Sequence, residues 1–272
     1  MVVNQIYGCN FMLTVLSPSK NLDFKTKLTT RKRSEPSFNS RTTELISQLQ
    51  QLSASNLKEL MSISDDLADL NYERYQNWSA PNGKRRPAIL SFRGDVYLGL
   101  SAETFGERDL TAAQRRLRIL SGLYGVLRPL DAIQPYRLEM GTGLPNSHGP
   151  DLYAYWNNEI ADTLNSELAS HRSPVLVNAA SNEYLSDDLI RKVNYRVVHC
   201  KFLERHRDDY RFMSYFGKRA RGLLARFVVL NRVDNPSRLR EFNAEGYYYS
   251  RERSTRDTVV FLRDNRAEPN TG

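Results

Sequence analysis

The chain has 272 residues, enough for one large domain or two small ones and for a sizeable hydrophobic core. Hydrophobic residues make up 40% of it and charged residues 26%, which is ordinary for a soluble globular protein, and no apolar run is long enough to span a membrane. The net charge of +8 favours anionic partners. Its two cysteines, Cys9 and Cys200, stand in no metal-binding spacing, which argues for a reducing, cytoplasmic setting and against structural zinc.

Residues 12–20 predict a short apolar strand followed by a loop that presents Ser17, Ser19 and Lys20. Because a strand so near the start leaves residues 1–11 redundant, we expect that prefix to be a disordered or misannotated extension, with Met1 and Met12 as alternative starts. No repeat or linker interrupts the rest. We therefore expect one domain over residues 12–263 and a disordered polar tail over 264–272.

Hydrophobic periodicity predicts the remaining elements in chain order. Helices are predicted over residues 41–70, 110–120, 152–168, 218–232 and 236–242, and strands over 87–92, 174–178, 193–203, 210–216, 247–250 and 258–262. The two kinds of element mix without regular alternation. The class is therefore α+β, or an irregular α/β arrangement, in a single mixed domain.

The stretch over residues 110–140 combines a basic amphipathic helix with a glycine turn. Its cationic and glycine positions are Arg115, Arg116, Arg118, Gly122, Gly125 and Arg128. With a second helix or turn beginning at Pro129, the stretch predicts a helix-hairpin-helix-like element whose backbone amides hold a phosphate. In the alternative interpretation the glycines only relieve steric crowding. The spacing leaves this alternative open, because the usual DNA-binding hairpin has its glycines two residues apart, whereas Gly122 and Gly125 are three apart.

The helix predicted over residues 218–232 carries the strongest basic cluster. Lys218, Arg219 and Arg221 lie on or beside one face, while Leu223 and Leu224 lie on the opposite, buried face. A solvated helix face is the alternative, but a glycine at position 222 in mid-helix is costly unless something approaches closely.

Polar residues at strand ends and glycine turns supply candidates for acid–base chemistry. They are Lys20, Asp95, Arg137 and Glu183. These residues form no recognised catalytic set, and neither a cofactor motif nor a metal-ligand spacing accompanies them. The sequence therefore predicts no cofactor and no metal site.

Several segments, in order along the chain, resemble the YaaA family of bacterial peroxide-stress proteins. They span residues 16–23, 61–64, 92–100, 120–131, 135–140, 178–184, 218–222 and 242–247. The resemblance implies a cytosolic protein that limits oxidative, iron-dependent damage, binds duplex DNA and has a single-domain α+β fold with a positively charged cleft. The chain departs from the family pattern in residues 1–11, in Arg93 for lysine, and in Asn182 for aspartate, which weakens residue 182 as an acid–base partner.

Two functions follow from these observations. In the first, the protein binds DNA without strong sequence specificity, the glycine hairpin and its arginines facing Lys218, Arg219 and Arg221 across a basic cleft. In the second, it is an enzyme acting on a nucleotide or purine-like small molecule. Convergence of Lys20, Asp95, Glu183 and Lys218 in one deep pocket would favour the enzyme, and an open groove of duplex width would favour DNA. Direct iron sequestration is a third option, which the poor ligand set disfavours.

Overall fold

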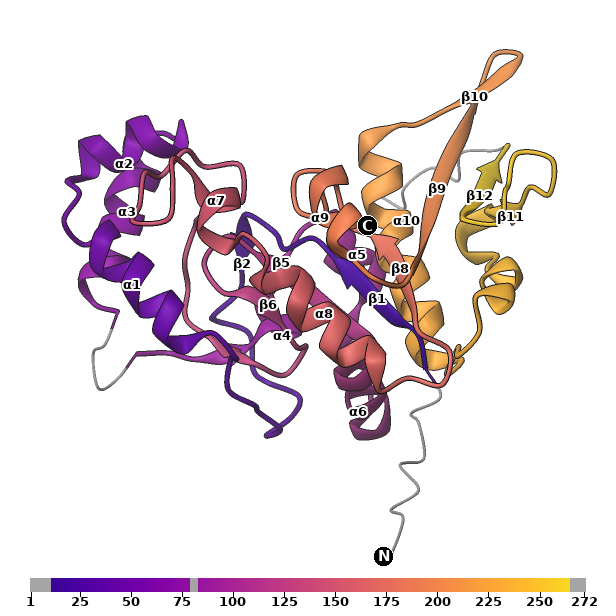
Figure 1. Cartoon of the computed structure of the whole chain (residues 1–272), viewed down its shortest axis with the longest axis horizontal. Helices are drawn as coiled ribbons and strands as arrows, with labels where there is room; N and C mark the ends of the chain where they lie inside the picture. Colours follow the sequence, from indigo (N-terminus) through magenta and orange to yellow (C-terminus); the bar gives the residue numbers. More distant parts are fainter. Residues whose placement is uncertain (1–10, 79–82, 265–272) are drawn as a thin grey trace, which may run out of the picture.

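A mixed β-sheet organises the protein (Figure 1). The computed structural model describes residues 11–78 and 83–264. The sheet has eight strands in the order β11-β12-β9-β8-β1-β5-β6, with β10 paired to β9. Its strands are β1 (Leu13–Leu16), β5 (Leu117–Ser121), β6 (Gly125–Leu127), β8 (Val175–Ala179), β9 (Arg196–His206), β10 (Asp209–Arg211), β11 (Tyr248–Tyr249) and β12 (Thr258–Arg263). The five central strands, β5, β1, β8, β9 and β12, run parallel, and only β6, β10 and β11 pair antiparallel.

Two hydrophobic clusters cover the two faces of this sheet. Alternate residues of β8 point to opposite faces, so Val175 and Val177 belong to one cluster and Leu176 belongs to the other. The first cluster includes Leu224 and Val228 of the long helix α10 (Ser214–Leu230). Every residue of β1, β5 and β8 is buried, and most of them are apolar, as is usual for parallel strands covered on both faces.

The other elements surround the sheet (Figure 1). Helices are α1 (Asn39–Leu49), α2 (Ala54–Met61), α3 (Asp65–Gln76), α4 (Ala88–Ser91), α5 (Asp95–Leu100), α6 (Glu107–Arg116), α7 (Leu152–Trp156), α8 (Glu159–Ala169) and α9 (Asp187–Lys192), with 3₁₀ turns η1 (Ala102–Thr104), η2 (Pro236–Glu241) and η3 (Ala244–Gly246). Short strands β2 (Asn21–Leu22) and β4 (Phe92–Arg93) pair with each other, as do β3 (Arg86–Pro87) and β7 (Ala132–Ile133). Helices plus a mixed sheet in one domain confirm the predicted α+β class.

The predicted helix-hairpin-helix-like element is wrong. The helix ends at Arg116, residues 117–127 form the antiparallel hairpin β5–β6, and the described residues between Pro129 and Leu152 contain no second helix. Leu117 and Leu120 fit a helical period, but β5 is buried on both faces and pairs with β1, so apolar residues are favourable at every position. Tertiary pairing therefore overrides the local pattern.

Three other predicted boundaries also differ. The strand predicted over 87–92 is mostly the single helical turn α4, and the helix predicted over 152–168 breaks at Asn157, whose φ is +35°. The strand predicted over 210–216 ends at Arg211, because α10 begins at Ser214. The predicted extension 1–11 and tail 264–272 lie, apart from Phe11 and Asp264, outside the described residues. Within the described ranges, the structure contains no helix of the length and apolarity needed to cross a membrane.

Candidate functional site: a cation-lined pocket at the sheet's switch point

The main candidate pocket lies beyond the carboxyl ends of β1 and β8. The chain passes from β1 to β5 on one side of β1, then returns to β8 on the other side and continues outward to β9. The strand order therefore reverses between β1 and β8. In open parallel sheets this switch point is where ligands bind, because the loops that leave the two strands diverge and open a crevice. The pocket has a volume of about 330 Å³, which suits a small metabolite.

The floor of the pocket joins the two loops that leave the switch point. The Ser17 hydroxyl accepts a hydrogen bond from the Ser181 amide at 2.8 Å, and the two hydroxyl oxygens lie 3.2 Å apart. The Tyr97 hydroxyl donates to the Ser17 carbonyl at 3.0 Å, and burial raises the pKa of Tyr97 well above its ordinary value. These contacts hold the loops in a fixed relation before any ligand arrives.

One wall of the pocket is the first half of α10, which contributes Lys218 and Arg221. Among the described residues neither side chain has a carboxylate partner or a hydrogen bond, and the Arg221 guanidinium faces the Phe212 ring, 5.8 Å from its centroid. Burial lowers the pKa of Arg221. A guanidinium nevertheless keeps its charge at neutral pH, so Arg221 cannot avoid the free-energy cost of a partly buried charge by losing its proton. This α10 cation pair is therefore arranged for an anion.

Lys20 and Glu183 also line the pocket, and each of them contacts the segment of residues 139–141. Lys20 Nζ lies 2.6 Å from Glu139 Oε2, while Glu183 Oε1 accepts a hydrogen bond from the Gly141 amide at 3.3 Å. Arg137 does not line the pocket, because its guanidinium pairs with the other oxygen of Glu139 at 3.1 Å. Arg137 thus supports a pocket residue through Glu139 and is not itself placed to touch a ligand.

Asp95 completes the pocket from the first residue of α5, which crosses α10 at very short range. A Cβ added at Gly222 would lie 1.8 Å from the Val96 carbonyl oxygen, and one at Gly99 would lie 2.2 Å from the Arg219 carbonyl oxygen. The mid-helix glycine at 222 is therefore explained by the backbone of α5, not by a ligand. Lys20, Asp95, Glu183 and Lys218 all line this one pocket.

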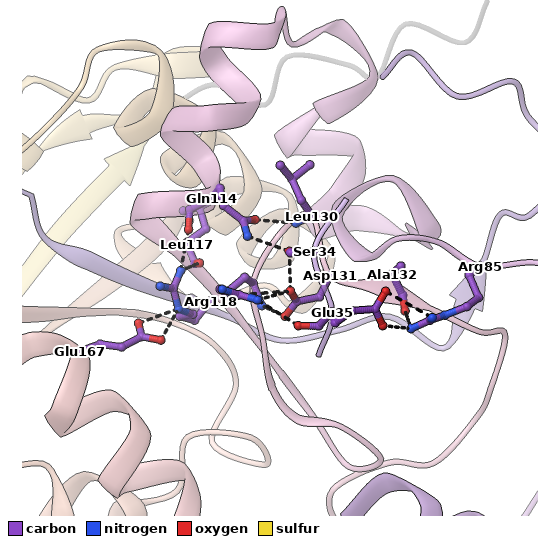
Figure 2. Close-up of polar contacts among 11 residues, drawn as sticks. Ser34, Glu35, Arg85, Gln114, Leu117, Arg118, Leu130, Asp131, Ala132 and Glu167 are labelled. Atoms are coloured by element: carbon purple, nitrogen blue, oxygen red, sulfur yellow. Dashed lines mark hydrogen bonds and ion pairs between the residues drawn. The ribbon is translucent and has the colours of Figure 1, made fainter. Parts of the chain in front are cut away.

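The arginines that were expected to hold DNA at the glycine hairpin are mostly engaged inside the protein (Figure 2). Arg118 is 7% exposed, and its Nε lies 2.7 Å from Glu167. Arg128 pairs with the buried Asp131 at 3.1 Å and donates to the Glu35 carbonyl. Both side chains therefore brace the fold, which leaves them poorly placed for phosphate contacts.

The two glycines of the hairpin allow neighbouring segments to pack closely, as the alternative interpretation predicts. The backbone of residues 138–139 passes over Gly122, where a Cβ would lie 2.6 Å from the Leu138 carbonyl oxygen. Gly125 has a φ of +66° and lies against the Trp156 ring, where an added Cβ would be 2.8 Å from the nearest ring carbon. The passage over Gly122 also determines where Glu139 stands, so the hairpin contributes to the pocket indirectly.

The remaining cations of the expected cleft do not face one another. Arg115 and Arg116 lie on α6 beside Arg232, which follows the end of α10. Lys218 lies near the beginning of α10, about 18 Å along the helix axis from the end of that helix. Arg219 pairs with Glu245, because its Nε donates to both carboxylate oxygens. The expected single basic cleft is thus two separate cationic regions.

The sequence predicts four residues of this pocket, but it assigns Arg221 to DNA binding, and it does not predict that Glu139 pairs with Lys20. Arg221 was detectable, because it lies three residues after Lys218 on the same helix. Glu139 gave no local signal, since its role depends on the chain crossing over Gly122. The described residues hold no cluster of three or more histidine, cysteine or acidic side chains suited to a metal ion.

The fold and the pocket define an α+β protein with a pocket lined by cationic side chains at the switch point of a largely parallel sheet. The family model described as peroxide stress protein YaaA matches residues 12–253 of the chain. The protein therefore belongs to the YaaA family of peroxide stress proteins.

Proposed function

We propose that the pocket binds a small phosphorylated molecule and that the protein is an enzyme acting on it. One observation carries this proposal. The α10 cation pair, Lys218 and Arg221, lines the pocket without a counter-ion among the described residues, and Lys20 lines the same pocket. A partly buried guanidinium without a carboxylate partner gains charge-assisted hydrogen bonds when it binds a phosphate.

Two carboxylates in the same pocket support the enzymatic part of the proposal. Asp95 and Glu183 come from separate segments and both line the cavity that the cations share. Glu183 is held by the Gly141 amide, which leaves its second oxygen for proton transfer. A phosphate held by the cations would bring the rest of the molecule within reach of these groups. Together they provide binding on one wall and acid–base chemistry on the others.

The binding part is tested by isothermal titration calorimetry with inorganic phosphate and pyrophosphate. Replacing Lys218 or Arg221 by glutamine removes a charge-assisted contact, so affinity is expected to fall about 10- to 100-fold. Arg238→Gln is the matched control, because Arg238 pairs with Glu241 outside the pocket. Equal affinities in the wild type and both pocket variants would contradict the proposal.

The catalytic part is tested by incubating the protein with a panel of ribonucleotides and following them by ³¹P NMR. Asp95→Asn and Glu183→Gln are expected to lower turnover about 10²- to 10⁴-fold while binding changes little. Unaltered turnover in both variants, or no turnover of any member of the panel, would contradict this part.

A second candidate function, DNA binding, is favoured by a shallow groove along α6. Lys32, Arg108, Arg115, Arg116 and Arg232 line this α6 groove, and Arg108 and Arg115 have no counter-ion within the described part of the chain. Arg108 and Arg115 are exposed, and exposed arginines suit the phosphate backbone of a duplex. In that role the protein binds DNA without strong sequence specificity and limits oxidative, iron-dependent damage.

The DNA proposal is tested with a labelled duplex at increasing salt. Affinity is expected to fall steeply with salt, and the double variant Arg108→Ala/Arg115→Ala is expected to reduce the slope by about 2. Lys218→Gln serves as the control, because it lies at the other end of α10. A flat salt response, or an unchanged slope in the double variant, would contradict a DNA role for this groove.

A further inference from the structure

Two large aromatic side chains are exposed beside the cationic wall of the pocket. Phe212 is 51% exposed and Tyr215 is 49% exposed, although buried sites are the usual place for such rings. Phe212 follows β10, and Tyr215 lies one helical turn before Lys218 on α10. The exposed aromatic surface therefore adjoins the residues that are arranged for an anion.

Phe212 is fixed in place by its contacts with α10. Its ring lies directly on the backbone at Gly217, where an added Cβ would be 2.2 Å from the ring carbon Cε2. The same ring faces the guanidinium of Arg221, with 5.8 Å between the guanidinium carbon and the ring centroid. The packing against Gly217 and Arg221 orders the ring, yet half of its surface remains open to solvent.

We propose that Phe212, assisted by Tyr215, is a stacking platform for the base of a nucleotide whose phosphate is held by the α10 cation pair. This inference rests on the proposed function of the pocket and narrows its ligand from any phosphorylated molecule to a nucleotide. An ordered aromatic ring next to unpaired cations complements both parts of a nucleotide, the planar base and the charged phosphate. A sugar phosphate would use only the cations and would leave the rings exposed.

The experiment compares ribose 5-phosphate with AMP, GMP, CMP and UMP by isothermal titration calorimetry. Stacking is expected to make at least one nucleotide bind about 5- to 100-fold more tightly than ribose 5-phosphate. Phe212→Leu is expected to remove that preference while leaving ribose 5-phosphate affinity unchanged. Tyr215→Leu is expected to weaken the preference, and Tyr72→Leu, on the distant helix α3, is the control for loss of an exposed aromatic ring.

The outcomes separate this inference from the proposal on which it rests. If ribose 5-phosphate binds through Lys218 and Arg221 but no nucleotide binds more tightly, the platform is wrong and the phosphate pocket stands. The same holds if the nucleotide preference survives in Phe212→Leu. If neither ribose 5-phosphate nor any nucleotide binds, or if binding ignores both cations, the proposed function itself is overturned.

Discussion

Gly222→Ala is the change that most directly tests how the pocket is held together. The added methyl would lie 1.8 Å from the Val96 carbonyl oxygen and 2.8 Å from the Leu100 amide nitrogen, both of which are backbone atoms. To reach an ordinary contact near 3.4 Å, α5 and α10 must separate by about 1.5 Å. Because Asp95 begins α5 and Lys218 lies on α10, this movement would widen the pocket.

The expected stability change has two opposing parts. Alanine in place of glycine in mid-helix favours folding by about 1 kcal/mol, whereas forcing extra volume into a packed contact costs about 1–3 kcal/mol or more. Since the obstacle is backbone and no side chain can turn away, we take the upper end of the cost and expect a net loss of about 2 kcal/mol. For a chain of this size that corresponds to a Tm about 4–8 °C lower.

Differential scanning calorimetry and urea unfolding measure this loss, and phosphate titration measures the effect on the pocket. Gly143→Ala is the matched control, because an added Cβ there would have no neighbouring atom within 4 Å. A Gly222→Ala variant as stable as the wild type, or more stable, would show that helix propensity outweighs the contact. The account of the α5–α10 crossing would then be wrong.

Two further predictions concern charged groups away from the pocket. Glu204 and Arg263 are 1% and 4% exposed and lie 2.9 Å apart, so Glu204→Met should destabilise the fold by about 3–5 kcal/mol in urea unfolding, because it removes the nearest and most buried carboxylate from the Arg263 guanidinium and leaves it with Glu245, 4.0 Å away. Glu204→Met/Arg263→Met should recover most of that loss, and a double variant no better than the single one would contradict this. Burial raises the pKa of the Asp23 carboxyl, but hydrogen bonds from Thr26, Arg93 and the Lys25 amide lower it by more, so the net pKa is below its ordinary value. Asp23→Asn should therefore be less stable than the wild type at pH 7, and the difference should shrink only as the pH falls below about 4; a difference that is constant from pH 7 to pH 3 would refute this linkage.

The sequence predicts most of the sheet but not its connections. Strands such as β1 and β8 are short apolar runs bounded by polar loops, and helices such as α10 have a clear amphipathic period, so both kinds of element are predicted from local pattern. The helix expected over 110–120 fails at Leu117, because pairing with β1 decides its conformation and a single sequence does not reveal that partner.

The pocket was predictable to the extent that its residues follow strand ends. Lys20 follows β1 and Glu183 follows β8, and loops at the carboxyl ends of parallel strands meet at one edge. Arg221 was missed as a pocket residue and Glu139 was missed as the ion-pair partner of Lys20, for different reasons. Arg221 is one of several basic residues on the same predicted helix, and nothing in the sequence separates it from the others. The position of Glu139 depends on the passage of residues 138–139 over Gly122, which local sequence does not reveal.

The proposed function of this pocket depends on phosphate binding by the α10 cation pair, which a single titration series measures. Phosphate and pyrophosphate are titrated into the wild type, Lys218→Gln, Arg221→Gln and the Arg238→Gln control, with folding of each variant checked by circular dichroism. We expect the wild type and the control to bind, and each folded pocket variant to bind about 10- to 100-fold more weakly. Equal binding by all four proteins, or no binding by the wild type, would contradict it.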